Sequence, residues 1–335
     1  MKRTVFLVVA LLALMVAVLP AQTRDPGEDW KKVDNNPFGT TAVNDIVFAN
    51  NTFIAVGAGG KIAYSDSGKT FVAVTNSQFG TSNIRAVANG GGRFVAVGDA
   101  GKAAYSTDNG RTWTAVASTG FGTSNILGIA YGGNRFVAVG QAGKIAYSTN
   151  GQTWTMVPAA SQPSKGDIVA IAFGSNRFII PDNYDYNGKL YQSGNGEAWT
   201  AIADSKFPAD GNSEITSVNF VNNMFFAGGS ATTPDGRNTS SNLPYSKDGL
   251  TWTGLPDTSY LRTMVASPKI LDIAFGAGKY YIVGSMGLFY STDNVTWTYI
   301  NVYDNIGRYS GVRCIVFGAN KFVVAGTSGM LSYLE

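Results

Sequence analysis

The feature that most constrains this chain is an internal repeat. The segment FVAVGDAGKAAYSTDNGRTWTAV, from Phe94 to Val116, is closely matched by segments that begin at Phe53 and Phe136. Weaker copies begin at Phe178, Phe225, Tyr280 and Phe322. A second aromatic series has the same number of members and includes all six tryptophans: Trp30, Phe71, Trp113, Trp154, Trp199, Trp252 and Trp297. The intervals in the first series are 41, 42, 42, 47, 55 and 42 residues, which predicts seven structural units.

Each unit contains four short runs that are typical of β-strands. In the third unit they are Ile126–Tyr131, Arg135–Gly140, Lys144–Ser148 and Trp154–Val157. They are rich in Val, Ile, Phe and Tyr and are bounded by Gly or Asn. Four strands in a period of this length are typical of a β-propeller blade, and no window shows a sustained helical period.

The phase of the repeat predicts how the ring closes. The chain ends at Glu335, just after the third strand of the last unit, Met330–Leu334. It begins with an unaccompanied fourth strand, Trp30–Val33. If that strand completes the last blade, no open sheet edge remains there. We therefore predict an all-β, seven-bladed β-propeller of four-stranded blades over residues 30–335, closed by residues 30–33.

The N-terminus has the pattern of a secretory signal. Lys2 and Arg3 precede an apolar run from Val5 to Leu19, and Pro20-Ala21 offers a small-residue cleavage site. The run is shorter than the roughly 20 residues of a membrane span, which favours a cleaved signal over an uncleaved anchor. We expect a signal peptide over 1–21, a linker over 22–29 and a secreted or periplasmic protein of bacterial type.

Composition excludes several chemistries. The chain has no histidine, which removes His-based catalysis and His-ligated metals, copper or haem oxidases included. Cys314 is the single cysteine, and its apolar strand favours a buried core residue over a reactive thiol. A net charge of +3 with no basic stripe does not indicate a nucleic-acid partner. We expect no metal and no cofactor.

The turn at 106–113, SerThrAspAsnGlyArgThrTrp, resembles the Asp-box, or BNR repeat, of sialidase-like propellers. The resemblance implies that Ser106, Asp108, Gly110 and Trp113 are structural, with Asp108 capping backbone amides and Trp113 packing beneath. The copies at 65–71, 148–154, 246–252 and 291–297 are one residue shorter, and the copy at 192–199 has Gly194 in place of the aspartate. All share a hairpin pair that we expect to supply the positive φ of a two-residue turn. WD40 and Kelch motifs do not occur.

The repeat is most disturbed on the face opposite these turns. Long loops occur at 181–188 and 230–244, and the links 201–214 and 254–269 are also long. Such loops often carry binding sites, although solvated loops of diverged repeats are the alternative. The candidate ligand-binding residues there are Asp182, Tyr184, Asp185, Tyr186, Asp235, Arg237, Tyr260 and Arg262. Tyrosines suit the recognition of sugars or peptides.

A second candidate site lies at the mouth of the central channel. Arg85 and Arg313 occupy equivalent positions early in the innermost strands of two units, with Asn44 and Asp45 between them. Two guanidiniums could bind a carboxylate or phosphate. Alternatively, they could pair with Asp45 and Asp272 in a structural network.

Two functions remain after these exclusions. The first is a monomeric, non-catalytic propeller that binds a glycan or protein partner or acts in assembly. The second is a glycoside hydrolase of the exo-α-sialidase type, which the resemblance brings in. The chain lacks that family's Arg-Ile-Pro segment and has more blades than the six usual there. Glu197 falls in a turn on the opposite face, so Glu214 is the glutamate that could serve such a reaction.

Overall fold

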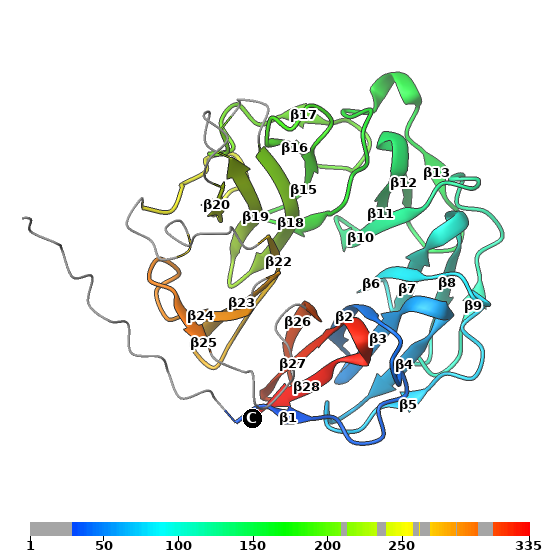
Figure 1. The fold of residues 1–335 in the computed structure, drawn as a ribbon. Helices are drawn as coiled ribbons and strands as arrows, with labels where there is room; N and C mark the ends of the chain where they lie inside the picture. Colours follow the sequence, from blue (N-terminus) through cyan, green and yellow to red (C-terminus); the bar gives the residue numbers. More distant parts are fainter. Residues whose placement is uncertain are drawn as a thin grey trace, which may run out of the picture.

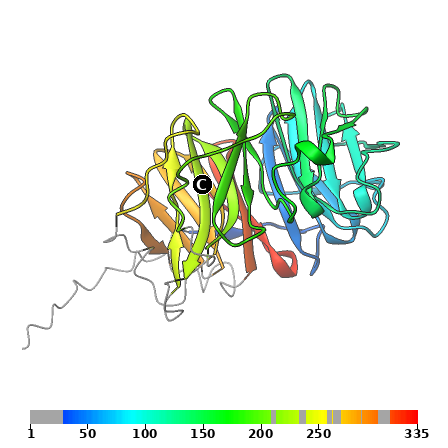
Figure 2. The ribbon, with the colours of Figure 1, turned by 90° about the horizontal axis from the view of Figure 1, so that it is seen from above.

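The computed structural model describes residues 29–208, 213–232, 239–256, 261, 269–285, 287–300 and 311–335. Seven antiparallel four-stranded sheets are arranged in a ring (Figure 1), and we refer to the centre of the ring as the channel. Seen from its edge, the ring has its strands running from one face to the other (Figure 2). The predicted seven-bladed β-propeller is confirmed, whereas the predicted signal peptide lies outside the described residues.

The first four blades follow one another in the chain, each with its strands in sequence order from the channel outward. Blade 1 contains β2 (Val43–Ala49), β3 (Thr52–Gly57), β4 (Ile62–Ser65) and β5 (Val72–Ala73). Blade 2 contains β6 (Ile84–Gly90), β7 (Arg93–Gly98), β8 (Ala103–Ser106) and β9 (Thr114–Ala115). Blade 3 contains β10 (Ile126–Gly132), β11 (Arg135–Gly140), β12 (Ile145–Ser148) and β13 (Thr155–Met156). Blade 4 contains β14 (Ala172–Gly174), β15 (Arg177–Asp182), β16 (Lys189–Ser193) and β17 (Thr200–Ala201).

The last three blades include two variations. Blade 5 contains β18 (Ser213–Val221), β19 (Met224–Thr232), β20 (Thr239–Asn242) and β21 (Tyr245–Ser246), and both β20 and β21 pair with β19. Blade 6 contains β22 (Ile270–Gly276), β23 (Lys279–Gly284), β24 (Gly287–Ser291) and β25 (Thr298–Ile300). Blade 7 contains β26 (Val312–Gly318), β27 (Lys321–Gly326), β28 (Leu331–Leu334) and, from the other end of the chain, β1 (Lys31–Lys32).

The closure of the ring follows the sequence prediction. Lys31 pairs with Tyr333 and Lys32 with Ser332, and the amide of Val33 donates to the carbonyl of Leu331 at 3.0 Å. Trp30 is buried against Tyr281 of blade 6. The strand therefore completes the sheet of blade 7 and also helps to fill the interface between blades 6 and 7 (Figure 1).

The core is divided among the interfaces between blades. Each of seven clusters of buried apolar side chains joins two neighbouring blades. At five of these interfaces an aromatic ring lies against a glycine at the end of the preceding inner strand. A Cβ on Gly132, for example, would lie 2.0 Å from the ring of Phe173. The other pairs are Gly90 with Tyr131, Gly174 with Phe220, Gly276 with Phe317 and Gly318 with Phe48. Glycine is required at these positions because a side chain would overlap the ring.

The two faces of the ring carry different turns. We call the face with the turns between third and fourth strands the motif face. On the other, the loop face, second strands lead to third strands, in four blades through short 3₁₀ turns: η1 (Ala58–Gly60), η2 (Asp99–Gly101), η3 (Gln141–Gly143) and η6 (Thr327–Gly329). Another such turn, η4 (Ala159–Ser161), lies in the link between blades 3 and 4. Within the described ranges, no helix is long and apolar enough to cross a membrane.

Side chains cap the turns of the motif face. In blade 2, Asp108 Oδ1 accepts from the amides of Arg111 at 3.1 Å and Thr112 at 2.9 Å. Ser106 Oγ accepts from the amide of Gly110, and Trp113 Nε1 donates to the carbonyl of Gly110. In blade 5, Asp248 Oδ1 accepts from Leu250 and Thr251 amides at 2.8 Å each. The shorter copy in blade 5 therefore keeps the same two aspartate caps with one residue fewer.

One detail of the turn prediction is wrong. In blade 4 the turn begins at Ser193, and Asn195 caps the amides of Glu197 and Ala198. Gly194 therefore does not occupy the aspartate position. The expected positive φ occurs in every hairpin pair, and in the blade 2 turn both Asn109 and Gly110 have it, at 57° and 77°. In the shorter copies only the second residue does, as with Gly151 at 67°.

Candidate binding site at the channel mouth

A β-bulge recurs near the start of the inner strand in six blades. The strand pairing skips one residue between Ile84 and Ala86, between Ile126 and Gly128, and at the equivalent place in blades 1, 5, 6 and 7. A bulge leaves one residue unpaired and turns its side chain. The skipped residues, with Val169 at the same repeat position in blade 4, form what we call the bulge ring: Asn44, Arg85, Leu127, Val169, Thr216, Leu271 and Arg313.

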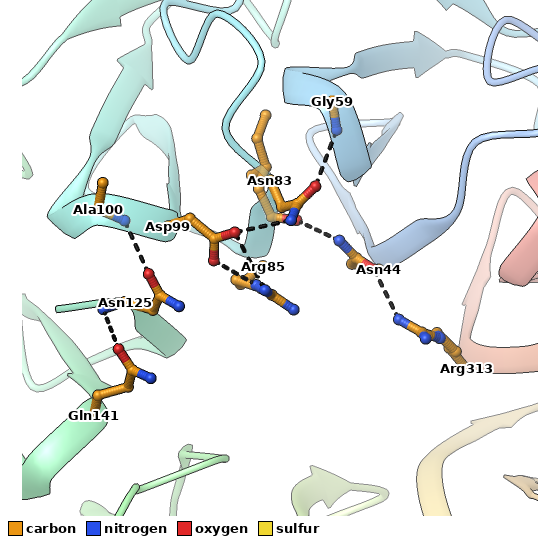
Figure 3. A network of polar contacts seen from close by, with 10 residues as sticks. Asn44, Gly59, Asn83, Arg85, Asp99, Ala100, Asn125, Gln141 and Arg313 are labelled. Atoms are coloured by element: carbon orange, nitrogen blue, oxygen red, sulfur yellow. Dashed lines mark hydrogen bonds and ion pairs between the residues drawn. The ribbon is translucent and has the colours of Figure 1, made fainter. Parts of the chain in front are cut away.

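The bulge ring has a polar and an apolar half. Arg313, Asn44 and Arg85 belong to the adjacent blades 7, 1 and 2, and Figure 3 shows them following one another along the inner edge of the ring. Leu127 and Val169 belong to blades 3 and 4, and 37% of Val169 is exposed. Leu271 in blade 6 is half-buried and packs against the core between blades 6 and 7, and Thr216 separates it from Val169. The ring therefore presents hydrogen-bonding groups on one side and aliphatic groups on the other.

Arg85 is held by an ion pair within its own blade. Its Nε donates to Asp99 Oδ1 at 2.7 Å and its Nη2 to Asp99 Oδ2 at 3.2 Å, while Asn83 Nδ2 also donates to Asp99 Oδ2 (Figure 3). Partial burial alone would raise the pKa of Asp99. The hydrogen bonds from Arg85 and Asn83, together with the arginine charge, hold that pKa below its usual value. The charge of Arg85 is thus offset locally.

Arg313 has a different environment. It is exposed, and its Nη1 donates to Asn44 Oδ1 at 3.0 Å. Asn44 Nδ2 in turn donates to the carbonyl of Ile84 at 2.8 Å, so Asn44 links blades 7 and 2 (Figure 3). No ion pair of Arg313 is present in the described part of the chain. The alternative that both arginines pair with Asp45 and Asp272 is therefore wrong: their partners are Asp99 and Asn44.

The rim beside the ring is held by a series of side-chain caps. Asn83 Oδ1 accepts from the amide of Gly59, and Asn125 Oδ1 accepts from the amide of Ala100 (Figure 3). Asp167 accepts from the amide of Ala142 in the same way. Each cap fastens the 3₁₀ turn of one blade to the start of the next. The channel mouth of blades 1 to 4 is consequently preorganised.

Two carboxylates lie on the inner strands, each directly after a residue of the bulge ring. Asp45 accepts from the amides of Ile46 and of Val87 in blade 2, each at 2.8 Å. Burial raises the pKa of Asp45 to about 6, although both hydrogen bonds oppose this. Neither contact is to an arginine, so Asp45 joins blades 1 and 2 through the backbone.

Asp272 repeats this arrangement between blades 6 and 7. It accepts from the amides of Ile273 at 2.9 Å and Ile315 at 2.8 Å. Burial, aided by the charge of Asp45, raises its pKa to about 8. Cys314 lies between the two acids in the ring, is buried, and donates to the carbonyl of Ala325 at 3.8 Å. Burial raises the pKa of its thiol well above the usual value, as suits a core residue.

In the loop of blade 4, one predicted ligand-binding residue is buried and the other three are exposed. Asp182 is buried and accepts from Ser164 Oγ at 2.6 Å and from the amide of Tyr184 at 3.0 Å. Asn183 makes two hydrogen bonds to the backbone of Ile215 in blade 5. Both residues therefore hold the loop in place. Tyr184, Asp185 and Tyr186 are exposed, with 54% of Tyr184 and 57% of Tyr186 accessible.

The remaining predicted residues do not extend this site. Asp235, Arg237, Tyr260 and Arg262 lie outside the described residues. Glu214 Oε2 accepts from Lys269 Nζ at 2.6 Å. Glu197 pairs with Arg135 on the motif face. Among the described residues, no group of three or more His, Cys, Asp or Glu side chains could hold a metal ion.

The comparison with protein families gives the same architecture. Residues 4–126 and 77–301 match the model of the DUF6242 β-propeller domain. The chain belongs to this family. The family description names the propeller alone, so the Asp-box likeness of the turns remains a resemblance. No curated protein matches the chain.

Solved structures with the same fold have low sequence identity to this chain. YCF48 from Cyanidioschyzon merolae is 19% identical over 92% of this chain and 98% of its own, with a TM-score of 0.66. A structure of YCF48 bound to D1 peptide is 16% identical over 94% and 97%, with a TM-score of 0.66. The extracellular domain of BT4673 from B. thetaiotaomicron is 13% identical, with a TM-score of 0.66, over 92% of this chain and 40% of that one. These likenesses show the fold.

Proposed function

We propose that this protein is a non-catalytic propeller that binds an extended polypeptide segment of a partner protein at the bulge ring. One observation carries the proposal. Six blades have a bulge at the same position of the inner strand, and the residue at the bulge differs between blades although the strands around it repeat. Bulges of this kind are commonly found beside functional sites.

The chemistry of the ring suits a polypeptide. Arg313, Asn44 and Arg85 offer donors and an acceptor for main-chain or acidic groups, while Leu127 and Val169 offer aliphatic contacts. Further out on the loop face, the exposed Tyr184 and Tyr186 add aromatic surface on a loop tied to blade 5. Rigid surfaces of this kind lose little entropy on binding. A fold relative with a bound peptide, YCF48 with D1 peptide, is consistent with this use of the fold.

The geometry does not favour glycoside hydrolysis. A sialidase-type reaction would need a glutamate to activate a tyrosine nucleophile, and Glu214 is the candidate for that role. Glu214 is instead ion-paired with Lys269, and the buried Asp45 and Asp272 accept backbone hydrogen bonds. A sialidase-type reaction has no support from the comparisons. We further propose, from the apolar run Val5–Leu19 alone, that binding takes place outside the cytoplasm. We also propose that the protein acts as a monomer.

The test is a selection of random dodecapeptides displayed on phage against the full chain. We expect enriched peptides whose affinity falls at least about tenfold in Arg313→Glu and Leu127→Asp, because each change opposes one half of the ring. Arg111→Glu on the motif face is the matched control and should bind normally. Thermal melting verifies that the variants are folded.

Two outcomes would count against the proposal. One is the absence of enriched peptides together with binding on a glycan array, which would make the ligand a sugar. The other is unchanged peptide affinity in both ring variants. Turnover of a fluorogenic sialoside would overturn the non-catalytic assignment.

A further inference from the structure

The polar half of the bulge ring has an unequal charge balance. Arg85 is matched by Asp99 in a two-bond ion pair, and Glu214 is matched by Lys269 at the start of blade 6. Arg313 has only the neutral Asn44 as a polar partner among the described residues. With both of these pairs neutral, the local net charge of the described residues depends on Arg313 and on two acids of the adjoining inner strands, Asp45 and Asp272.

Each of these two acids is connected to Arg313 through a residue close to it. Asp272 binds the amide of Ile315, two residues after Arg313, and Asp45 directly follows Asn44, to which Arg313 donates. The thiol of Cys314 lies between them and stays neutral. With both acids protonated the group carries +1, and with both ionised it carries −1, because two negative charges are added to one positive charge.

We propose that the polar half of the bulge ring binds a carboxylate of the bound polypeptide, and that loss of protons from Asp45 and Asp272 weakens this binding. The proposal rests on the function proposed above and adds the chemistry and the regulation of the same site. A guanidinium with exposed donors forms strong, charge-assisted hydrogen bonds to a carboxylate. Carboxylates placed nearby in a partly buried channel reduce that attraction through Coulomb repulsion of the ligand.

The direction of the pH effect follows from the surroundings of the acids. Burial favours their neutral forms and raises the pKa of Asp45 to about 6 and that of Asp272 to about 8. Both acids therefore ionise as the pH rises through the neutral range. Affinity for a carboxylate is highest near pH 5 and falls toward pH 9, opposite to the behaviour expected from ionisation of the ligand itself.

The repeat offers variants that are compatible with the fold. The residues equivalent to Asp45 and Asp272 in the other blades are Ala86, Gly128, Ala170, Ser217 and Cys314. Asp272→Ser copies blade 5 and Asp45→Ala copies blade 2. The exposed Asp66 on the motif face supplies the control variant Asp66→Ala. A melt of each variant shows whether it is folded.

The experiment uses three probes: acetyl-Leu-Leu-Leu with a free carboxyl terminus, the same peptide as the amide, and acetyl-Leu-Leu-Glu amide. Their binding is followed by the ¹H–¹⁵Nε signal of Arg313. We expect the first or third probe to shift this signal and the amide of the first to leave it unmoved, which distinguishes a chain terminus from an acidic side chain as the source. Affinity should fall at least about tenfold from pH 5 to pH 9.

The variants decide the role of the acids. In Asp45→Ala/Asp272→Ser the affinity should vary less than about twofold with pH, and Asp66→Ala should match the unmodified protein. Equal binding of the amide, no shift with any probe, or a pH dependence that survives in the double variant would overturn the proposal. Selected dodecapeptides that bind the ring regardless of pH would overturn it while leaving the proposed function intact. If a carboxylate probe binds but no dodecapeptide is selected, the carboxylate site stands and the proposed polypeptide-binding function is overturned.

Discussion

The aspartates of the motif face and those of the channel make the same kinds of contact and behave in opposite ways. Asp248 accepts two backbone amides in an exposed turn, and those hydrogen bonds, from Thr251 and then Leu250, lower its pKa to about 2. Asp272 also accepts two backbone amides, yet burial raises its pKa to about 8. For the pKa of Asp272, desolvation outweighs the hydrogen bonds, whereas for the pKa of Asp248 the hydrogen bonds outweigh desolvation. The turn aspartate is therefore a structural cap, while the channel aspartate retains the capacity to change charge.

The largest expected effect separates the structural role of the motif face from the surface role of the bulge ring. Trp113→Ala should lower the free energy of unfolding by about 3–5 kcal/mol, because a buried indole and its bond to Gly110 are lost. Arg313→Ala, at an exposed ring position, should change it by less than about 0.5 kcal/mol. Urea denaturation measures both. Comparable losses would remove the distinction between the two faces.

The next effect concerns the channel acids. A carboxyl whose pKa is raised by folding stabilises the protein at low pH, and this stabilisation is lost as the pH rises toward the folded pKa. For Asp272, with a pKa of about 8, the loss covers the range from about pH 4 to pH 8. Asp272→Ser should be less stable than the unmodified protein at pH 5, and the difference should shrink by at least about 1 kcal/mol by pH 9. A constant difference across urea titrations at these pH values would contradict the assignment.

The smallest effect concerns the turn acids. Their pKa values are lowered by folding, so their stabilisation is present above about pH 4 and is lost as the pH falls toward 2. Asp248→Asn should be nearly neutral at pH 7, because Asn150 and Asn195 cap the equivalent turns. It should also reduce the loss of stability in acid. Asp248→Ala removes the cap and should cost about 1 kcal/mol at pH 7. Equal stability of the alanine and asparagine variants would show that the cap contributes nothing.

The fold could be predicted from the sequence because its signals are local and repeated. Seven blades can be predicted because the hairpin turns and the aromatic series recur at a nearly fixed spacing. The closure can be predicted because the unaccompanied strand at Trp30 supplies the fourth strand that the last unit lacks. The misaligned turn at 192–199 shows where this fails. Gln192 and Ser193 both resemble the first residue of the motif, and only the hydrogen bonds to Ser193 and Asn195 decide between them.

The candidate site could be predicted only in part, because it depends on strand pairing. Arg85 and Arg313 stand out as charges within apolar strands. Leu127 looks like an ordinary core residue until the bulge register shows that it is skipped in the pairing. Asp182 looked like a ligand-binding residue because burial cannot be read from a loop sequence. Asp99, the partner of Arg85, lies 14 residues away in a turn whose position depends on the hairpin.

The pairing of β1 with β28 has a consequence for the order in which the protein is made. Blades 1 to 4 are continuous in the chain and can form as each leaves the ribosome. Blade 7 needs strands from both ends of the propeller, so its outer strand has no partner until residues 331–334 have been synthesised. Until then, the apolar surface that will cover Trp30 stays open. Completion of the ring is therefore a late event in biosynthesis, and a chain truncated before Leu331 would lack the β28 to which its first strand pairs.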